Sequence, residues 1–238
     1  MPDGLLEDTP TRALAIYAHP DDPEVSCGGT LARWAGAGAE VHAVVAARGE
    51  KGSLDPATDP HALAERRAGE VTEAAQVMGL AGVEQLDHPD GELHAVADLR
   101  AELVEVIRRL RPDVVLCPDP TAVFFGDAYV NHGDHRAIGW ATLDAVTPAA
   151  YSPLYHPGCG PPHAVATLLL TASLEPDAWV DVESSLETKV AALFCHRTQL
   201  APDADRWLSD FVRARAEEEG QRAGVRYAEG FRRLRLRR

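Results

Sequence analysis

Short apolar runs alternate along the first half of the chain with longer segments in which apolar residues recur at helical spacing. The apolar runs predict strands at 13–18, 41–47 and 114–117, and a further short strand is expected at 83–86. The segments between them predict helices over about 30–35, 61–78 and 96–110. Alternation of this kind is typical of a parallel sheet covered by helices. We therefore expect an α/β fold with a mostly parallel sheet flanked by helices.

The second half of the chain has a less regular pattern. It begins with a long loop over 118–133, rich in aromatic and polar residues, and a helix is expected from about His135. Proline and glycine make 148–162 irregular. Two strands are then expected at 164–171 and 179–182, followed by an amphipathic helix at 184–195 and a helical remainder. Because no Ser/Gly/Pro linker divides the chain, we expect one domain over residues 1–238.

Composition narrows the classes of partner. The net charge of −14 argues against a general nucleic-acid or anionic-membrane binder, which would need a basic face. Five arginines between positions 232 and 238 are a local exception, and we interpret them as a solvated or partner-docked tail. Four scattered cysteines without a CxxC pair or a preceding signal peptide favour free thiols and a cytoplasmic location. No apolar stretch is long enough to span a membrane.

Two clusters that mix histidine with aspartate follow the first and fourth predicted strands. His19 and Asp22 follow the first, and His132 and His135 follow the fourth. In an open α/β sheet, ligands bind at the carboxyl ends of the strands. Since a catalytic zinc site keeps three protein ligands and one open position, His19 and Asp22 could supply two of them. Spacing alone leaves a structural interpretation open, in which Asp21 is only a helix N-cap or turn carboxylate.

A series of motifs, in order over nearly the whole chain, resembles the LmbE/PIG-L family of zinc-dependent de-N-acetylases. The motifs are His19-Pro-Asp-Asp22 with Gly28-Gly29-Thr30, Arg48-Gly-Glu50-Lys-Gly52, Arg67-x-x-Glu70, Pro89-Asp90-Gly91, His132-x-Asp-His135 and His196-x-Thr-Gln199. The two metal motifs are specific, whereas the others are individually weak. Thr198 stands where serine is usual in the family.

The resemblance implies a Rossmann-like three-layer fold and assigns roles at the site. It implies that His19, Asp22 and His135 bind Zn²⁺. Asp21 would then be the general base that takes a proton from the attacking, zinc-activated water. His132, held by Asp134, would be the oxyanion stabiliser or acid, although Asp134 could instead cap the following helix.

Weaker candidates surround this set. The resemblance makes Arg48, Glu50, Arg67 and Asp90 candidates for substrate contact, although loop glutamates and helix arginines are commonly solvated. Tyr129, in the long loop before His132, is a weaker candidate for the oxyanion donor and for substrate contact.

The expected activity is hydrolysis of an acetyl or other acyl group from a small molecule bearing an N-acyl amino sugar, without nucleic-acid or membrane partners. The family resemblance also allows a homo-oligomer. Alternatives are an amidase for a larger biosynthetic or mycothiol-like conjugate, a non-haem iron oxygenase, and a non-catalytic metal-binding protein. A nucleotide-binding module is disfavoured because no GxGxxG or P-loop sequence is present.

Overall fold

A seven-stranded sheet forms the centre of the computed structural model, which describes residues 4–236 except the side chain of Asp205. The strand order is β3-β2-β1-β4-β7-β9-β8. Strands β1 to β4 and β7 are parallel, and β9 runs antiparallel to both of its neighbours. The bounds are β1 Arg12–Tyr17, β2 Glu40–Ala47, β3 Gly82–His88, β4 Val114–Pro118, β7 Thr167–Thr171, β8 Ala178–Asp181 and β9 Ala228–Arg235.

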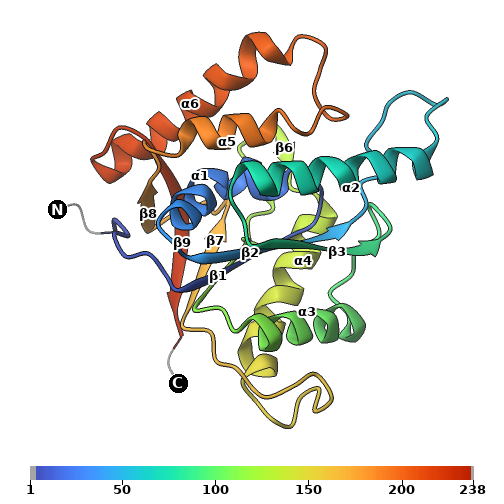
Figure 1. Cartoon of the computed structure of the whole chain (residues 1–238), viewed down its shortest axis with the longest axis vertical. Helices are drawn as coiled ribbons and strands as arrows, with labels where there is room; N and C mark the ends of the chain where they lie inside the picture. Colours follow the sequence, from blue (N-terminus) through green and yellow to red (C-terminus); the bar gives the residue numbers. More distant parts are fainter. Residues whose placement is uncertain (1–3, 237–238) are drawn as a thin grey trace.

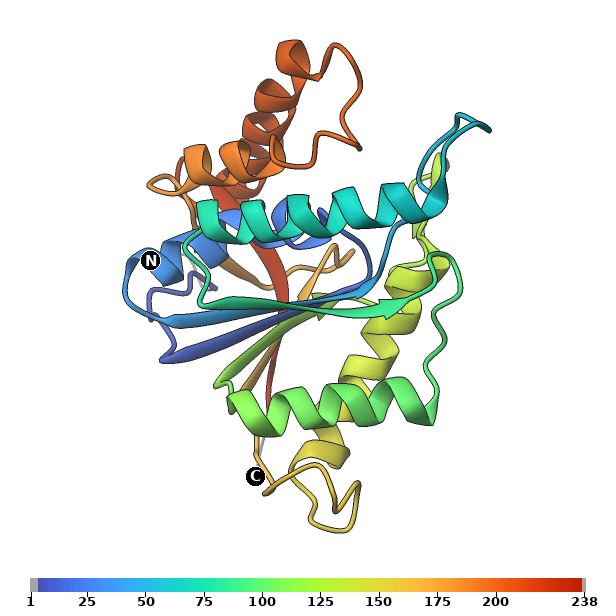
Figure 2. The ribbon, with the colours of Figure 1, turned by 45° about the vertical axis from the view of Figure 1, so that its right-hand side comes forward.

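Helices cover both faces of the sheet, which confirms the predicted three-layer α/β fold. Helices α1, α2, α5 and α6 lie on one face, and α3 and α4 lie on the other (Figures 1 and 2). Their bounds are α1 Asp22–Gly36, α2 Pro60–Val77, α3 Ala97–Leu110, α4 Gly133–Asp144, α5 Leu186–Leu193 and α6 Ala204–Ala223, with a π-helical segment η1 at Ala145–Ala150. None of the helices within residues 4–236 combines the length and apolar character needed to cross a bilayer.

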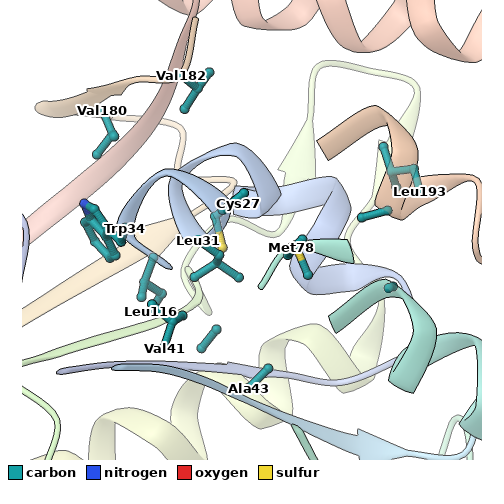
Figure 3. Close-up of a cluster of buried hydrophobic side chains, with 14 of the residues drawn as sticks. Cys27, Leu31, Trp34, Val41, Ala43, Met78, Leu116, Val180, Val182 and Leu193 are labelled. Carbon is teal, nitrogen blue, oxygen red and sulfur yellow. The ribbon is translucent and has the colours of Figure 1, made fainter. Parts of the chain in front are cut away.

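Strand β1 separates two hydrophobic clusters because its side chains alternate between the faces of the sheet. Ala15 and Tyr17 join the cluster under α1 and α2, which includes Leu31 and Met78 (Figure 3). Ile16 joins the other cluster, against α3 and α4. All of β1 after its first residue is buried, so both faces must be apolar. This requirement explains why the strand reads as a continuous apolar run.

The long loop after β4 contains a small hairpin. Its strands are β5 Phe124–Phe125 and β6 Tyr129–Val130, which pair with each other and not with the main sheet. Phe124, Tyr129 and Val130 are exposed. The hairpin leads directly into the segment that carries His132 and His135.

Two predicted elements need correction. Helix α1 begins at Asp22, not near Thr30, and is interrupted at Cys27, whose φ of −149° is not helical. The C-terminal segment is strand β9 between β7 and β8, not a helix or a solvated tail. Phe231 is fully buried in this strand. The strand pairs with β7 and β8, which are distant in sequence, so no local signal marks it. Arg237 and Arg238 lie outside the described residues.

Arg108 is a buried cation that organises the irregular segment after α4. Its side chain is 2% exposed, and its guanidinium donates only to backbone carbonyls in the hydrogen bonds described for residues 4–236. The acceptors are Ala149, Ala150, Ser152, Tyr155, His156 and Gly160. One side chain thus supplies hydrogen-bond donors to the backbone carbonyls of a segment that has no regular backbone pairing of its own.

Replacing Arg108 should destabilise the fold strongly. Arg108→Met leaves several of these carbonyls without a donor, so we expect the free energy of unfolding to fall by about 2–4 kcal/mol. Arg109→Met is the matched control, because Arg109 makes an exposed ion pair with Glu84 and should cost less than about 1 kcal/mol. Urea denaturation followed by circular dichroism measures both, and equal losses would contradict the role given to Arg108.

Candidate active site

The predicted site residues meet where the sheet topology reverses direction. From β1 the chain passes to β2 and β3 on one side, and then crosses to β4 on the other side of β1. The loops that leave the carboxyl ends of β1 and β4 therefore diverge, and such a switch point is where open α/β sheets bind ligands. His19 and Asp22 follow β1, and His132 and His135 lie at the start of α4, beyond β4.

The side chains of three residues form a compact triangle at this point. His19 Nδ1 lies 3.2 Å from His135 Nε2 and 3.4 Å from Asp22 Oδ2. Asp22 Oδ1 lies 3.2 Å from His135 Nε2. Atoms that ligate zinc tetrahedrally at about 2.0–2.1 Å are roughly 3.3 Å apart, so the triangle has the size that a bound zinc ion requires. Two imidazoles and a carboxylate are also a donor set suited to zinc.

A second cluster of possible ligands, formed by His19, His132 and Asp134, fits a metal less well. The Asp134 carboxylate is 2% exposed and already accepts hydrogen bonds from Gly91 N–H at 2.8 Å and Leu93 N–H at 3.1 Å. A metal there would compete with those donors. We therefore favour the triangle formed by His19, Asp22 and His135.

Each of the two histidines of the triangle has a partner for its other ring nitrogen. His19 Nε2 lies 3.1 Å from Asp134 Oδ2 and 3.3 Å from Asp90 Oδ1. His135 Nδ1 lies 3.0 Å from the Oδ1 of Asn131. Such partners fix the tautomer and the ring orientation of metal-binding histidines. Sequence reasoning missed Asn131, although a polar residue four positions before His135 was a signal for it.

The contacts of Asp134 differ from those expected. Its carboxylate orients His19 and not His132, whose Nδ1 accepts only the backbone N–H of Asp134, at 3.2 Å. Helix α4 begins at Gly133, so His132, and not Asp134, occupies the N-cap position that was the alternative role for Asp134. Burial and the neighbouring His19 lower the pKa of His132, which favours the neutral ring.

Asp21 occupies the N-cap position of α1, but its side chain makes no capping hydrogen bond. Its φ of 87° lies in the left-handed region, which is strained for a residue other than glycine. Burial and the adjacent charge of Asp22 raise the pKa of Asp21 to about 7. The carboxylate next in sequence to Asp22 is therefore free of capping and has a pKa in the range useful for proton transfer near neutral pH.

The electrostatics of the triangle favour a positive charge. Burial lowers the pKa of His19, but hydrogen bonds to Asp22 and Asp90 outweigh it and raise this pKa to about 11. Burial raises the pKa of Asp22, yet the hydrogen bonds from His135 and His19 lower it overall. The same carboxylates that stabilise a proton on His19 would stabilise a metal cation.

The predicted substrate contacts divide into two groups. Arg67 is 3% exposed and donates to the carbonyls of Gly49 and Gly52. It therefore fixes the loop that follows β2. Glu50 accepts the backbone N–H of Asp90 at 3.1 Å. These residues bind neighbouring loops, and Asp90 itself lies against His19.

Arg48 and Tyr129 are more accessible. Arg48 lies 3.3 Å from Glu50 and donates to the carbonyl of Asp87 at 2.8 Å. Tyr129 is 53% exposed on the β5–β6 hairpin, with its ring 5.9 Å from that of Phe125. Of the five candidates, these two keep the most accessible surface for a substrate.

The His196-x-Thr-Gln199 motif contacts the loop that carries the His19-Pro-Asp-Asp22 motif. Thr198 donates its backbone N–H and its hydroxyl to Glu70, at 2.9 and 2.6 Å, so threonine makes the hydroxyl contact that serine could make. Gln199 Nε2 donates to the carbonyl of Pro20 at 2.8 Å. The turn after α5 is thereby tied to both α2 and the loop between His19 and Asp22.

With this geometry in place, the chain can be compared with known proteins. The family model described as "PIG-L: GlcNAc-PI de-N-acetylase" matches residues 14–146. The chain belongs to the PIG-L family. This match contains every residue of the triangle and ends before strands β7, β8 and β9 and helices α5 and α6.

Relatives in this family are similar over most of the chain. The diacetylchitobiose deacetylase of Thermococcus kodakarensis is 31% identical and covers 93% of this chain and 82% of its own length. A 1D-myo-inositol 2-acetamido-2-deoxy-alpha-D-glucopyranoside deacetylase of Kineococcus radiotolerans is 29% identical, over 83% of this chain and 71% of its own length.

A solved structure agrees with these matches. The N,N'-diacetylchitobiose deacetylase of Pyrococcus horikoshii has a TM-score of 0.85 and 30% identity, with coverage of 95% of this chain and 84% of that one. The predicted family and the predicted enzyme class, a deacetylase that hydrolyses amide bonds, are confirmed.

Asn131 should matter for metal affinity. Asn131→Ala removes the acceptor for His135 Nδ1, so we expect affinity for Zn²⁺ to fall about 10–100-fold, as for other partners of metal-binding histidines. Asn131→Asp keeps an acceptor oxygen and should lose much less. Competition with a chromogenic chelator measures both constants, and wild-type affinity in Asn131→Ala would contradict this role.

Proposed function

We propose that this protein is a zinc-dependent deacetylase that removes the acetyl group from an N-acetylglucosamine-type small molecule. The observation that carries the proposal is the triangle of His19, Asp22 and His135 with the uncapped carboxylate of Asp21 beside it. The names of the relatives support the substrate class, because they are deacetylases of acetylated amino sugars. A single domain and a cytoplasmic location belong to the same proposal.

Bound zinc supplies a Lewis acid that polarises an amide carbonyl and lowers the pKa of water. Asp21 then takes the proton from the attacking water and returns it to the leaving amine. The Asp21 side chain makes no capping hydrogen bond, so its carboxylate is free to exchange this proton. The buried hydrogen bonds of His19 and His135 keep their rings oriented during this exchange.

His132 is the proposed donor to the developing oxyanion. It is exposed, and its ring centroid is 4.8 Å from that of His19 in an edge-on arrangement. Its Nδ1 accepts a backbone N–H, which leaves the hydrogen on Nε2 and makes this atom a donor even in the neutral ring. No charge on His132 is needed for this role.

An amidase for a larger conjugate is the second candidate function. The observation that favours it is the exposed apolar surface of the hairpin just before His132, formed by Phe124, Tyr129 and Val130. Such a rim would contact the part of a substrate that lies beyond the amide. The α/β sheet argues against the iron oxygenase alternative, which we associate with an all-β fold.

A substrate panel tests the proposal. Zinc-loaded protein is incubated with N-acyl glucosamines, chito-oligosaccharides and glucosaminyl conjugates, and the released amine is measured. We expect release from N-acetyl substrates and its loss after treatment with a chelator. Release only from large conjugates would support the second candidate, and no release from any substrate would contradict both.

The two adjacent aspartates should respond differently to the same substitution. Asp21→Asn removes the base but no ligand, so we expect zinc to remain bound while kcat falls by about 10²–10⁴-fold. Asp22→Asn is the matched control and should weaken zinc binding as well. Metal content by atomic emission and steady-state kinetics measure both effects, and loss of zinc from Asp21→Asn alone would show that the roles are reversed.

A further inference from the structure

The break in helix α1 separates the catalytic segment from the rest of the helix. Cys27 interrupts the helix, so residues 22–26 form a short first segment and residues 28–36 form a second. Such a break leaves carbonyls without donors at the end of the first segment and N–H groups without acceptors at the start of the second. The first segment begins with Asp22 and follows Asp21 directly.

Lys189 of α5 and Glu229 of β9 satisfy both sides of the break. Lys189 Nζ donates to the carbonyl of Val25 at 3.0 Å. The Glu229 carboxylate accepts the N–H of Gly29 at 3.0 Å and that of Thr30 at 2.7 Å. Lys189 and Glu229 also bind each other, at 2.6 Å. The cation thus lies at a helix C-terminus and the anion at a helix N-terminus, the favourable arrangement for both dipoles.

This ion pair is buried and closely enclosed. The side chains of Lys189 and Glu229 are 9% and 6% exposed. A Cβ atom at Gly29 would lie 2.9 Å from Val182 Cβ and 3.1 Å from Glu229 Oε1, and one at Gly28 would lie 3.3 Å from Lys189 Cγ. The two glycines therefore let the ion pair approach the backbone of α1. The Gly28-Gly29-Thr30 motif does not match a nucleotide-binding pattern. Its glycines instead allow the ion pair to pack closely against α1.

A short chain of bonds connects the ion pair to the aspartates. Lys189 holds the carbonyl of Val25, and the N–H of Val25 donates to the carbonyl of Asp21 at 2.9 Å. We propose that the buried pair of Lys189 and Glu229 positions the first segment of α1, and through it the Asp21 base and the Asp22 ligand. The kinetic part of this inference rests on the proposed function, whereas the metal-binding part does not.

Stability and positioning make different predictions for this pair. A buried ion pair often contributes little net stability compared with uncharged residues of similar size. Removing both charges together therefore avoids leaving one buried charge unpaired. The double variant Lys189→Met/Glu229→Gln does this while keeping the side-chain volumes similar, and it loses the donor to Val25.

The double variant should fold and yet bind metal and substrate differently from the wild type. We expect its Kd for Zn²⁺ to rise about 10–100-fold and its kcat at saturating zinc to fall about tenfold or more, with KM within twofold. The control is Glu187→Gln on the same helix, which breaks the exposed ion pair with Arg213 and should leave the Kd for Zn²⁺, kcat and KM unchanged.

The measurements on the double variant decide whether Lys189 and Glu229 position the first segment of α1. A folded double variant with wild-type Kd for Zn²⁺ and wild-type kcat overturns the proposal. If the wild type is inactive on every substrate, the proposed function fails, but the change in zinc affinity still tests the positioning role. Circular dichroism and thermal unfolding establish whether the variant is folded.

Amide hydrogen exchange of the wild-type protein tests the proposal without any variant, and decides it if the double variant does not fold. Coupling between the ion pair and the metal site must be reciprocal. Zinc binding should therefore slow exchange at the N–H groups of Gly29 and Thr30, which Glu229 accepts. Unchanged exchange at both amides on zinc addition would overturn the proposal.

Discussion

A single buried carboxylate, that of Asp134, connects three loops at the carboxyl edge of the sheet. It accepts hydrogen bonds from His19 after β1 and from the backbone of Gly91 and Leu93 after β3, while its own residue belongs to α4 after β4. Because it is 2% exposed, water cannot replace these partners. The bond to His19 Nε2 leaves Nδ1 facing Asp22 and His135, so the geometry of the triangle depends on this contact.

Around this centre, the family motifs form a second layer of support. Arg67 holds the loop after β2, and Gln199 holds the carbonyl of Pro20. The ion pair of Lys189 and Glu229 bridges the break in α1. Lys189, Gln199 and Glu229 lie beyond the residues that the family model matches. The residues proposed for metal binding and proton transfer therefore come from the first two thirds of the chain. Part of the structure that positions them comes from the last third.

Local signals explain what could be predicted. The strands around β1 are buried on both faces, so they read as continuous apolar runs, and the intervening helices keep their 3.6-residue spacing. The candidate site residues follow strand ends and match a family motif. The same reasoning missed β9, because its pairing partners are distant in sequence and its arginines resemble a solvated tail. It also placed the start of α1 too late, because the polar residues there serve the site.

The sequence by itself therefore determined the α/β class and the two clusters of histidine and aspartate after strand ends, since these depend on periodicity and on residues close together in the chain. The three-layer order and the ligand set came from the family resemblance. Only the tertiary structure decided which partner each polar group takes. It assigned Asp134 to His19, Asn131 to His135 and Arg67 to backbone carbonyls. A hydrogen bond needs two groups within about 3.5 Å in a suitable direction, and residues far apart in sequence meet that condition only after the strands have packed.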